Sequence, residues 1–560
     1  MATSTEFVSS PHVDLLAHYQ RVHSGAPTAH ETEHAMRFDE AAAQTPLVST
    51  SPDIGPQDGE SSDPAVLLPL PREWSRVRRE QLQLPSEKRA LPSLRVDTND
   101  PRLLRRGLWL ACAVMYLPSV LQAEEALSRA SDEPLPELSF SSLAGLAASS
   151  AAATVAAPTV LERISELRVP HSFEVSVVSG GITNQLYRCS LATHPHAPVL
   201  VRIYGPRTEL VIDRSKENEV VDVLSVRQQG PRIFGRFGNG RLESWLSGHS
   251  LTPAEMREPG MARMIAATLA RLHCQSMPFP RSPVIASVLR KWSQIAAEVS
   301  FPDNASKQAI LDQLNLPEVV RAVEEFLSRV ERSYYGSRSA LVFAHNDLLS
   351  GNVMYDAGVA ASAATAAASS SAAASSPSAS SAPSASAAAA VPRVFLVDFE
   401  YANFNPRAFD LANHFAECCG FECEWEHFPK RGQMQNFMES YINAVKNVQE
   451  EQQASDAHSS EGTTVAASAA AVISPSSSSS SSSLSCACSE LYAEVQAWLL
   501  APHLFWTLWA VVQGRHSPID FEYLPYSLLR FQAFKDMKPK WERWVEATPE
   551  TLEKLMESEP

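Results

Sequence analysis

The sequence of 560 residues has little of what marks a nucleic-acid-binding or secreted protein. Basic residues are fewer than acidic ones: the chain has 47 Lys and Arg and 63 Asp and Glu, which gives a net charge of −16. This balance argues against a general surface for nucleic acid. The eight cysteines follow neither the paired spacings of a zinc site nor the dense pattern of a small secreted domain. Reduced thiols in a cytoplasmic protein are therefore expected.

Signals for export and for membrane insertion are also missing. The segment Met1–Ser10 is polar and has no basic residue, so no secretory signal is expected there. The main apolar run, 107–121, contains Pro118. At about fifteen residues it falls short of the roughly 20 that a membrane-spanning helix needs. A buried or interfacial helix is favoured over a membrane anchor, and no stable membrane span is expected.

Three stretches lack the periodic apolar pattern of folded elements. Residues 1–157 are broken by blocks of Pro, Ser and Ala, 357–390 is almost wholly Ala and Ser, and 453–486 ends in a polyserine run. Such segments bury too little apolar surface to offset the entropy of ordering. We expect a largely disordered N-terminal extension, two disordered inserts, and a compact region over about 158–452 and 487–545. The 44% hydrophobic content is that of a globular protein.

Two short motifs carry the strongest chemical signal. In the first, His345-Asn-Asp347 is followed five residues after the Asp by Asn352, and in the second Asp398 ends the apolar run 394–397. This order suits phosphoryl transfer to a hydroxyl, in which Asp347 accepts the proton while Asn352 and Asp398 supply oxygen ligands to Mg²⁺. Either motif alone would more often be a chance pairing. Together, in this order, they indicate a kinase.

The insert between the two motifs explains their unusual separation. Removal of 357–390 shortens the Asn352–Asp398 spacing from 46 to 12 residues. The flanking segments 353–355 and 391–397 then read as two short strands, which predicts a hairpin with one metal ligand at each end. A long insertion in the turn costs little, because closure entropy grows only logarithmically with loop length.

Residues upstream of these motifs favour a nucleotide site. Ser179, Gly180 and Asn184 lie in a turn between two strands, where Gly allows close approach to phosphate and polar side chains can bond its oxygens. The pattern is not GxGxxG, and a hairpin without a ligand is at least as common. Arg202 lies mid-strand, in the place where a kinase usually keeps a lysine for the phosphates.

A helix after Asp213 places Glu217 on its apolar stripe, where an unpaired charge would be costly. We therefore predict an Arg202–Glu217 ion pair, the alternative being that Glu217 reaches water from the first turn. Residues 241–246 are expected to form an edge strand and hinge whose backbone meets adenine.

Taken together, the motifs SGGITN, VLVRIYG, HNDLLSGN, VDFEYANFNPRAFDLANHF and HLFWTLWAVVQGRHSPIDFEYLPYSLLRF resemble the choline/ethanolamine kinase family over about 170–430 and 490–540. The resemblance implies an α+β, bilobal protein-kinase-like fold with a small β-rich N-lobe at 158–250 and a larger helical C-lobe at 251–545. It also implies ATP- and Mg²⁺-dependent phosphorylation of an amino alcohol, the first step towards phosphatidylethanolamine or phosphatidylcholine.

The resemblance further implies a role for each motif residue. Asp347 would be the base, Asn352 and Asp398 the metal ligands, and Arg202 with Glu217 the nucleotide pair. The remaining nucleotide contacts and the amine pocket would be formed by Ser179, Gly180, Asn184, Glu417, Trp506, Trp509, Tyr523 and Tyr526. Without the resemblance, an aromatic stripe at helical spacing would be read as plain core.

The segment 410–417 is predicted to be a helix that serves the site. Asp410, His414 and Glu417 share one face of it. An Asp buried near the catalytic loop can accept backbone N–H bonds, and Glu417 can neutralise an ammonium group. For His414, a core histidine is favoured over a catalytic one.

Ethanolamine is favoured over choline as the substrate. A primary ammonium needs hydrogen-bond acceptors, whereas a quaternary one has no N–H and needs an aromatic cage. The small loop Cys418-Cys419-Gly420-Phe421 is similar to ethanolamine kinases, while Trp425 as a cage wall keeps choline or dual specificity open. A pseudokinase would typically lack one of the three motif residues Asp347, Asn352 and Asp398, and all are present.

A cytoplasmic protein with a small-molecule substrate and no nucleic-acid partner is expected. A homodimer is an open alternative to a monomer.

Overall fold

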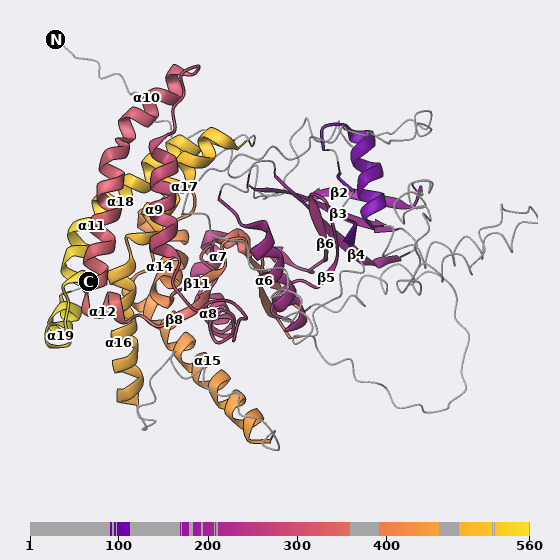
Figure 1. Cartoon of the computed structure of the whole chain (residues 1–560). Helices are drawn as coiled ribbons and strands as arrows, with labels where there is room; N and C mark the ends of the chain where they lie inside the picture. Colours follow the sequence, from indigo (N-terminus) through magenta and orange to yellow (C-terminus); the bar gives the residue numbers. More distant parts are fainter. Residues whose placement is uncertain are drawn as a thin grey trace, which may run out of the picture. The chain divides into compact units, whose positions relative to one another are not determined.

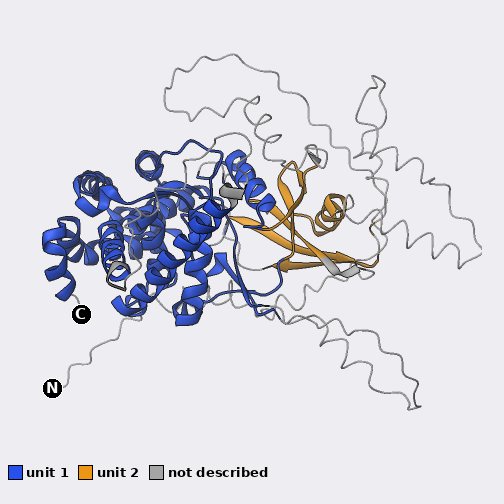
Figure 2. Ribbon diagram, turned by 90° about the horizontal axis from the view of Figure 1, so that it is seen from below, with its two compact units in different colours: residues 1–23, 206–230, 246–560 blue, residues 24–205, 231–245 orange. Residues whose placement is uncertain are grey.

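The computed structural model describes residues 94–96, 98–112, 171–178, 183–191, 194–205, 211–358, 391–458, 481–517 and 521–558, with the single positions 90, 91, 169, 208 and 519. The chain divides into two compact units (Figure 2). In its described part, unit 1 comprises 208–230 and 246–558, and unit 2 comprises 90–205 and 231–245. Each unit is described by itself below.

Unit 2 is built on a six-stranded sheet with the order β1-β5-β6-β4-β3-β2. Its strands are β1 (Ala90–Leu91), β2 (Phe173–Val178), β3 (Asn184–Leu191), β4 (His194–Tyr204), β5 (Ile233–Phe237) and β6 (Gly240–Ser244). All neighbours pair antiparallel except β1 and β5, which run parallel. In β4 the apolar positions Val199, Val201 and Ile203 are all buried, as their alternation along one face predicts.

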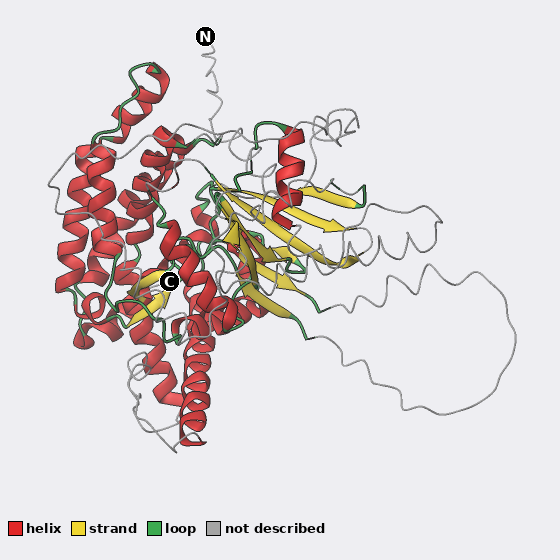
Figure 3. Cartoon of the chain, turned by 45° about the vertical axis from the view of Figure 1, so that its right-hand side comes forward, coloured by secondary structure: helices red, strands yellow, loops and turns green. Residues whose placement is uncertain are grey.

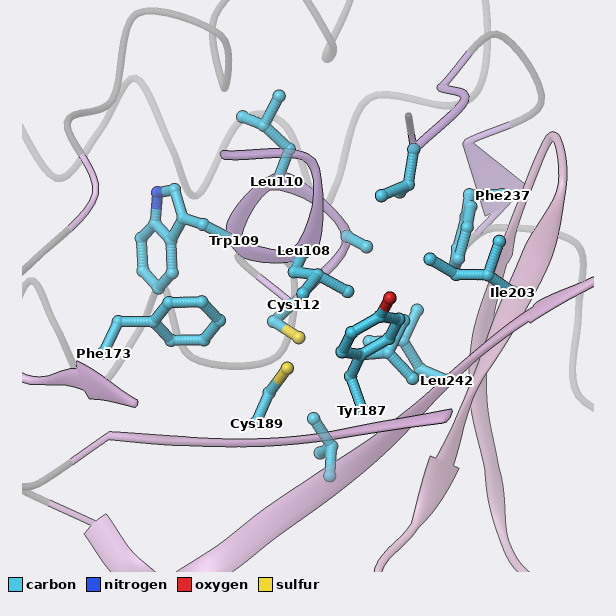
Figure 4. Close-up of a cluster of buried hydrophobic side chains, with 14 of the residues drawn as sticks. Leu108, Trp109, Leu110, Cys112, Phe173, Tyr187, Cys189, Ile203, Phe237 and Leu242 are labelled. Atoms are coloured by element: carbon cyan, nitrogen blue, oxygen red, sulfur yellow. The ribbon is translucent and has the colours of Figure 1, made fainter. Parts of the chain in front are cut away.

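A helix over residues 101–112 packs on this sheet (Figure 4). Leu108 and Trp109 are almost fully buried, and the Trp109 ring contacts the Phe173 ring at 5.3 Å. Cys112 faces Cys189 of β3, both as free thiols. The predicted extension therefore contains a segment, 94–112, that belongs to the hydrophobic core of unit 2. The expected buried helix is present over 107–112, and 113–121 lies outside the described residues.

The prediction of an edge strand at 241–246 is wrong. Strand β6 is interior, because β4 pairs on one side of it and β5 on the other. The sequence pattern could not show this, since β5 is short and its pairing with β6 depends on the turn at 238–239. Arg241 and Glu243 are consequently buried within the sheet and not at its margin.

Unit 1 contains the short strands that carry the kinase motifs. They are β7 (His249–Ser250), β8 (Leu341–Ala344), β9 (Val353–Asp356), β10 (Arg393–Leu396) and β11 (Asn403–Pro406), with the 3-10 turn η4 (Ser350–Asn352). They form a three-stranded sheet of order β10-β9-β7 and a β11-β8 pair. The predicted hairpin is confirmed, because β9 and β10 pair antiparallel with Asp356 opposite Arg393. Within the insert, 359–390 lies outside the described residues.

Helices make up most of unit 1 (Figures 1 and 3). The first group is α6 (Arg214–Val226), α7 (Pro253–Arg257), α8 (Pro259–His273), α9 (Ile285–Ala297), α10 (Ala305–Leu314), α11 (Leu316–Arg332) and α12 (Tyr334–Arg338). The second is α14 (Arg407–Glu417), η5 (Trp425–His427), α15 (Arg431–His458), α16 (Ser481–Trp498), α17 (Ala501–His516), α18 (Tyr523–Val545) and α19 (Pro549–Glu557). Helix α17 packs on α18, α8 on α15, and α14 on α16.

The division into units differs from the predicted lobe boundaries. Helix α6 and strand β7 fall within the predicted N-lobe but group with unit 1. The contacts explain this, because β7 pairs with β9 and Arg214 of α6 is hydrogen-bonded to Glu400. The α+β architecture is confirmed in its essentials, with one β-rich unit and one larger helical unit.

Two helices extend into the second predicted insert. Helix α15 continues to His458 and α16 begins at Ser481, so 453–458 and 481–486 are helical, contrary to the prediction. Residues 459–480 lie outside the described residues. The apolar stretch Leu484–His516 is long enough to cross a membrane, but its apolar window is buried entirely within the protein, as in the core helix of a globular protein.

Candidate active site

The catalytic loop of unit 1 is held by one buried carboxylate on α14. Asp410 accepts hydrogen bonds from the backbone N–H groups of His345 and Asn346, each at 2.7 Å, and from Nε2 of His273 at 2.9 Å. Burial raises the pKa of Asp410, but the hydrogen bonds and nearby imidazoles outweigh it and leave the pKa below its usual value. The prediction that Asp410 braces the backbone beside Asp347 is therefore confirmed.

Three further hydrogen bonds fix the same loop in an uncommon conformation. Asn346 adopts a left-handed φ of 65°, which Asn tolerates better than most residues. Its amide donates to the Tyr401 carbonyl at 2.9 Å and accepts from Asn405 at 2.9 Å. His345 Nε2 donates to the carbonyl of Val397 at 3.0 Å. These bonds tie the loop to the segment that carries the second motif.

The three predicted catalytic and metal-binding residues are brought together. Asn352 Nδ2 donates to Asp347 twice, to the backbone oxygen at 2.9 Å and to Oδ2 at 3.0 Å. The backbone oxygen of Asn352 accepts from Val397 N at 3.0 Å, directly before Asp398. Asp398 itself has a left-handed φ of 64°, a sparsely populated conformation of the kind that clusters at active sites.

The charge around Asp347 is strongly negative. Burial raises the pKa of Asp347 well above its usual value, and the carboxylates of Glu400, Glu417 and Asp398 raise it further. Its Oδ1 atom is buried and accepts no hydrogen bond from any described residue. A carboxyl group with elevated proton affinity and an open oxygen is suited to accept a proton from a hydroxyl.

The donor set beside Asp347 fits a divalent cation. Because the amide nitrogen of Asn352 bonds to Asp347, its amide oxygen is the atom left for a metal. The backbone bond from Val397 to Asn352 brings the chain at Asp398 to the same part of the site. Mg²⁺ prefers such oxygen ligands and keeps water or phosphate in the rest of its shell. Among the described residues there is no cluster of three or more His, Cys, Asp or Glu side chains that would hold a metal alone.

Glu400 is an acidic residue of the site that was not predicted from the sequence. It accepts from Arg214 Nη1 at 3.3 Å, and the same nitrogen donates to Glu217 at 2.7 Å. Nη2 of Arg214 donates to Thr208 at 2.7 Å. Glu400 could have been predicted from its place two residues after Asp398. Its hydrogen bond from Arg214 could not have been predicted, since the bond joins positions that are 186 residues apart in the chain.

The predicted aromatic residues of the tail form one connected cluster. The Trp506 and Trp509 rings are 5.5 Å apart, Trp509 and Tyr523 are 5.5 Å apart, and Phe521 lies between Tyr523 and Tyr526 at 4.8 and 5.8 Å. All four predicted residues are buried. Such rings could line a site for a cation, which is attracted to the face of an aromatic ring.

Tyr401 joins this cluster to Glu400 and Asp347. Its hydroxyl accepts from Trp509 Nε1 at 2.7 Å, and its ring lies 5.8 Å from that of Trp506. Burial raises the pKa of Tyr401 well above its usual value, and Glu400 and Asp347 raise it further. Tyr401 was not predicted from the sequence, although it stands three residues after Asp398 in the second motif.

Glu417 lies at the end of α14 with a partner that the sequence did not reveal. Arg530 of α18 donates from Nη1 to Glu417 Oε1 at 2.9 Å. Both side chains are buried. His414, one turn earlier, packs against the Phe437 ring at 4.7 Å, and burial lowers its pKa to about 4. It is therefore the neutral core histidine that was expected.

In unit 2, the predicted nucleotide residues are only partly described. Ser179 and Gly180 lie outside the described residues. Asn184 is buried at the start of β3, where its amide donates to the Thr183 hydroxyl at 3.1 Å. Arg202 is buried on β4 and donates from Nε to Glu243 at 2.9 Å.

Glu243 is the acidic partner inside unit 2. It also accepts from Arg241 Nε at 2.6 Å, and the two arginines hold its pKa below the usual value although burial raises it. The predicted partner of Arg202, Glu217, belongs to unit 1 and is paired there with Arg214. The Arg202–Glu217 pair joins residues of different units and stays a prediction.

A comparison with known families agrees with this geometry. The model of the choline/ethanolamine kinase family matches residues 175–535, which is well over half of the chain. The chain belongs to this family. It is thus a kinase, and the match spans both the strands of unit 2 and the catalytic motifs of unit 1.

Relatives with assigned names are similar over most of their own length. A probable ethanolamine kinase of Arabidopsis thaliana is 30% identical over 66% of this chain and 80% of that protein. Ethanolamine kinase 2 of mouse is 29% identical over 68% of this chain and 82% of its own. Among solved structures, an ethanolamine kinase of Plasmodium vivax aligns with a TM-score of 0.49 and 22% identity, covering 67% of this chain and 83% of that one.

Proposed function

We propose that this family member transfers the terminal phosphoryl group of ATP, with Mg²⁺, to the hydroxyl of ethanolamine. The product is phosphoethanolamine, made in the cytoplasm as the first step of phosphatidylethanolamine synthesis by the CDP-ethanolamine route. The observation that carries the proposal is the placement of Asp347. It is hydrogen-bonded to Asn352, lies within the electrostatic reach of Asp398, and is connected through Tyr401 to an aromatic cluster.

The chemistry follows from the position and charge of Asp347. Its open Oδ1 accepts the proton of the substrate hydroxyl as the oxygen attacks phosphorus, while the bond from Asn352 to Oδ2 fixes the carboxyl plane. Mg²⁺, when bound by Asn352 and Asp398, would neutralise charge on the phosphate oxygens. The buried surroundings strengthen these interactions relative to water.

The acidic groups near Asp347 support a primary ammonium as the substrate cation. Glu417 is close enough to raise the pKa of Asp347, and among the described residues its carboxylate accepts one side-chain hydrogen bond, from Arg530. A primary ammonium brings three N–H donors, each of which needs an acceptor. Carboxylate oxygens and the Tyr401 hydroxyl can supply them, which is why ethanolamine fits better than a quaternary amine.

Choline kinase, or dual specificity, is the second candidate. The aromatic cluster of Trp506, Trp509, Tyr523 and Tyr526 favours it, because ring faces attract a quaternary ammonium without hydrogen bonds. Probable choline kinase 1 of Arabidopsis thaliana is also similar, at 26% identity over 65% of this chain. Trp425, considered as a cage wall, contacts the His503 ring at 5.0 Å.

The deciding experiment compares the two amino alcohols on the purified full-length protein. We expect kcat/KM for ethanolamine to exceed that for choline by about tenfold or more, because unpaired donors or acceptors in a site cost about this much. Initial rates of ADP release with each substrate measure it. A preference for choline would contradict the proposed substrate. Oligomeric state is a separate question, and sedimentation of the same sample would distinguish a monomer from a homodimer.

A second prediction concerns the Ala- and Ser-rich insert. Deletion of 359–390, with a two-residue Asn-Gly turn in its place, should leave kcat and KM within about twofold of the full-length enzyme. The reason is that β9 and β10 pair in full from Asp356–Arg393 to Val353–Leu396 without it. A folded but inactive product would show that the insert takes part in catalysis. A shorter deletion, of 365–385, serves as the control for turn geometry.

A further inference from the structure

Arg530 is a charged residue in the core of unit 1 that no part of the mechanism above uses. It lies on α18 with no exposed surface. Its Nη1 donates to Glu417 at 2.9 Å across 113 residues of sequence, and its guanidinium lies over the Tyr526 ring at 5.8 Å. A guanidinium is costly to bury unless an anion accompanies it. Loss of either residue of the Glu417–Arg530 pair would therefore leave the other as an uncompensated buried charge.

The pair lies beside the residues assigned to the amine pocket. Glu417 raises the pKa of Asp347, so the two carboxyl groups interact, and Tyr526 belongs to the aromatic cluster. The titratable groups that face Glu417 or Arg530 from the surrounding elements are Asp347, Cys418, Cys419, Cys423, His503 and Tyr526. Burial and Arg530 hold the pKa of His503 well below its usual value, and burial raises that of Cys423 to about 12. These two neighbours are thus neutral, and Arg530 is the cation that balances Glu417.

Burial alone would favour the uncharged form of Glu417. The pKa of this carboxyl is raised by burial, and the charge and hydrogen bond of Arg530 act in the opposite direction. An uncharged Glu417 would lose most of its attraction for an ammonium group. Arginine suits this task because its guanidinium stays protonated at any physiological pH.

We propose that Arg530 is a positioning residue that holds Glu417 as an oriented anion, ready to accept a hydrogen bond from the ammonium group of the substrate. The proposal rests on the proposed function and deepens it, because it assigns recognition of the amine to the ion pair of Glu417 and Arg530. Arg530 donates to one oxygen of Glu417, and in the described part of the chain no other side chain donates to its second oxygen, which can accept from the amine.

The test is a kinetic comparison of Arg530→Met and Arg530→Lys with ethanolamine as the amine substrate, because its primary ammonium group carries the N–H donors that the proposal requires. In Arg530→Met we expect the KM for the amine to rise about tenfold or more at about pH 6.5, with kcat and the KM for ATP within about threefold. Without the guanidinium the pKa of Glu417 rises further, so its anionic fraction grows with pH. The rise in KM should therefore be several-fold smaller at about pH 8.5. Arg530→Lys, which keeps the charge, should restore most of the affinity.

Two additional variants separate this role from a purely structural one. Arg329→Met removes ion pairs to Glu542 of α18 and to Glu546, the residue directly after this helix. These pairs lie away from the amine pocket, so the KM for the amine should be unchanged. If Arg530→Met fails to fold, the KM for the amine is measured in Arg530→Lys and Glu417→Gln instead. Glu417→Gln should then show a similar rise in KM that does not depend on pH.

Several results would overturn the inference. An Arg530→Met enzyme with an unchanged KM for the amine would do so, as would a rise that is equal at both pH values and not relieved by lysine. A Glu417→Gln enzyme with normal KM would also overturn it. If the unmodified protein phosphorylated neither ethanolamine nor choline, the proposed function and this inference would fail together, whereas an active enzyme with an unaffected Arg530→Met variant would remove only the inference.

Discussion

Replacement of Asp347 by Ala is expected to lower kcat by about 10²–10⁴-fold, the range that a general base contributes. Asn352 should remain in place, because its amide also donates to the backbone oxygen of residue 347 at 2.9 Å. The loss should therefore appear in kcat, with little change in the KM for ATP. Transfer of labelled phosphate from ATP to the amino alcohol measures it directly.

The same position should show a trade-off between activity and stability. Burial, Glu400, Glu417 and Asp398 all raise the pKa of Asp347, so its ionised form is destabilising in the folded protein at neutral pH. Asp347→Asn, which removes the charge and keeps the shape, should be inactive and should raise the melting temperature. Asp356→Ala, at the far end of β9, is the matched control and should retain activity. A fully active Asp347→Ala enzyme would end the role assigned to this residue.

Asp410→Ala is expected to have the second largest effect, on folding and on catalysis together. The substitution leaves the buried N–H groups of His345 and Asn346 without their acceptor, and each such group costs about 1–3 kcal/mol. We expect the free energy of unfolding to fall by about 2–6 kcal/mol and kcat to fall by about 10²-fold, because the loop that holds Asp347 loses its support. Urea unfolding and initial rates measure the two effects.

The pH dependence of stability tests the same contacts. The pKa of Asp410 is lowered in the folded state, so its carboxylate stabilises the protein above the unfolded pKa of about 3.9. This stabilisation should be lost as the pH falls below about 4. In Asp410→Asn, which retains one acceptor oxygen, unfolding should depend less on pH in this range. Equal stability of the original and Asp410→Ala proteins would show that the loop does not depend on this carboxylate.

The sequence by itself determined the local parts of the site. The spacing of Asp347, Asn352 and Asp398 was enough to predict that they serve one site, and the hairpin of β9 and β10 followed from two short apolar runs. Helical periodicity likewise placed Asp410 on the face of α14 that meets the catalytic loop. These features depend on backbone geometry over a few residues, and a pattern of side chains records that geometry directly.

Only the tertiary structure decided the partners of the buried charges. Glu243 accepts from Arg202 within unit 2, Arg530 pairs with Glu417, and the helix at 101–112 enters a core that the sequence assigned to later strands. Each of these contacts joins segments far apart in the chain. A sequence with 110 charged residues offers many candidate ion pairs. The packing of elements selects among them, because it determines which charges leave water and must be compensated.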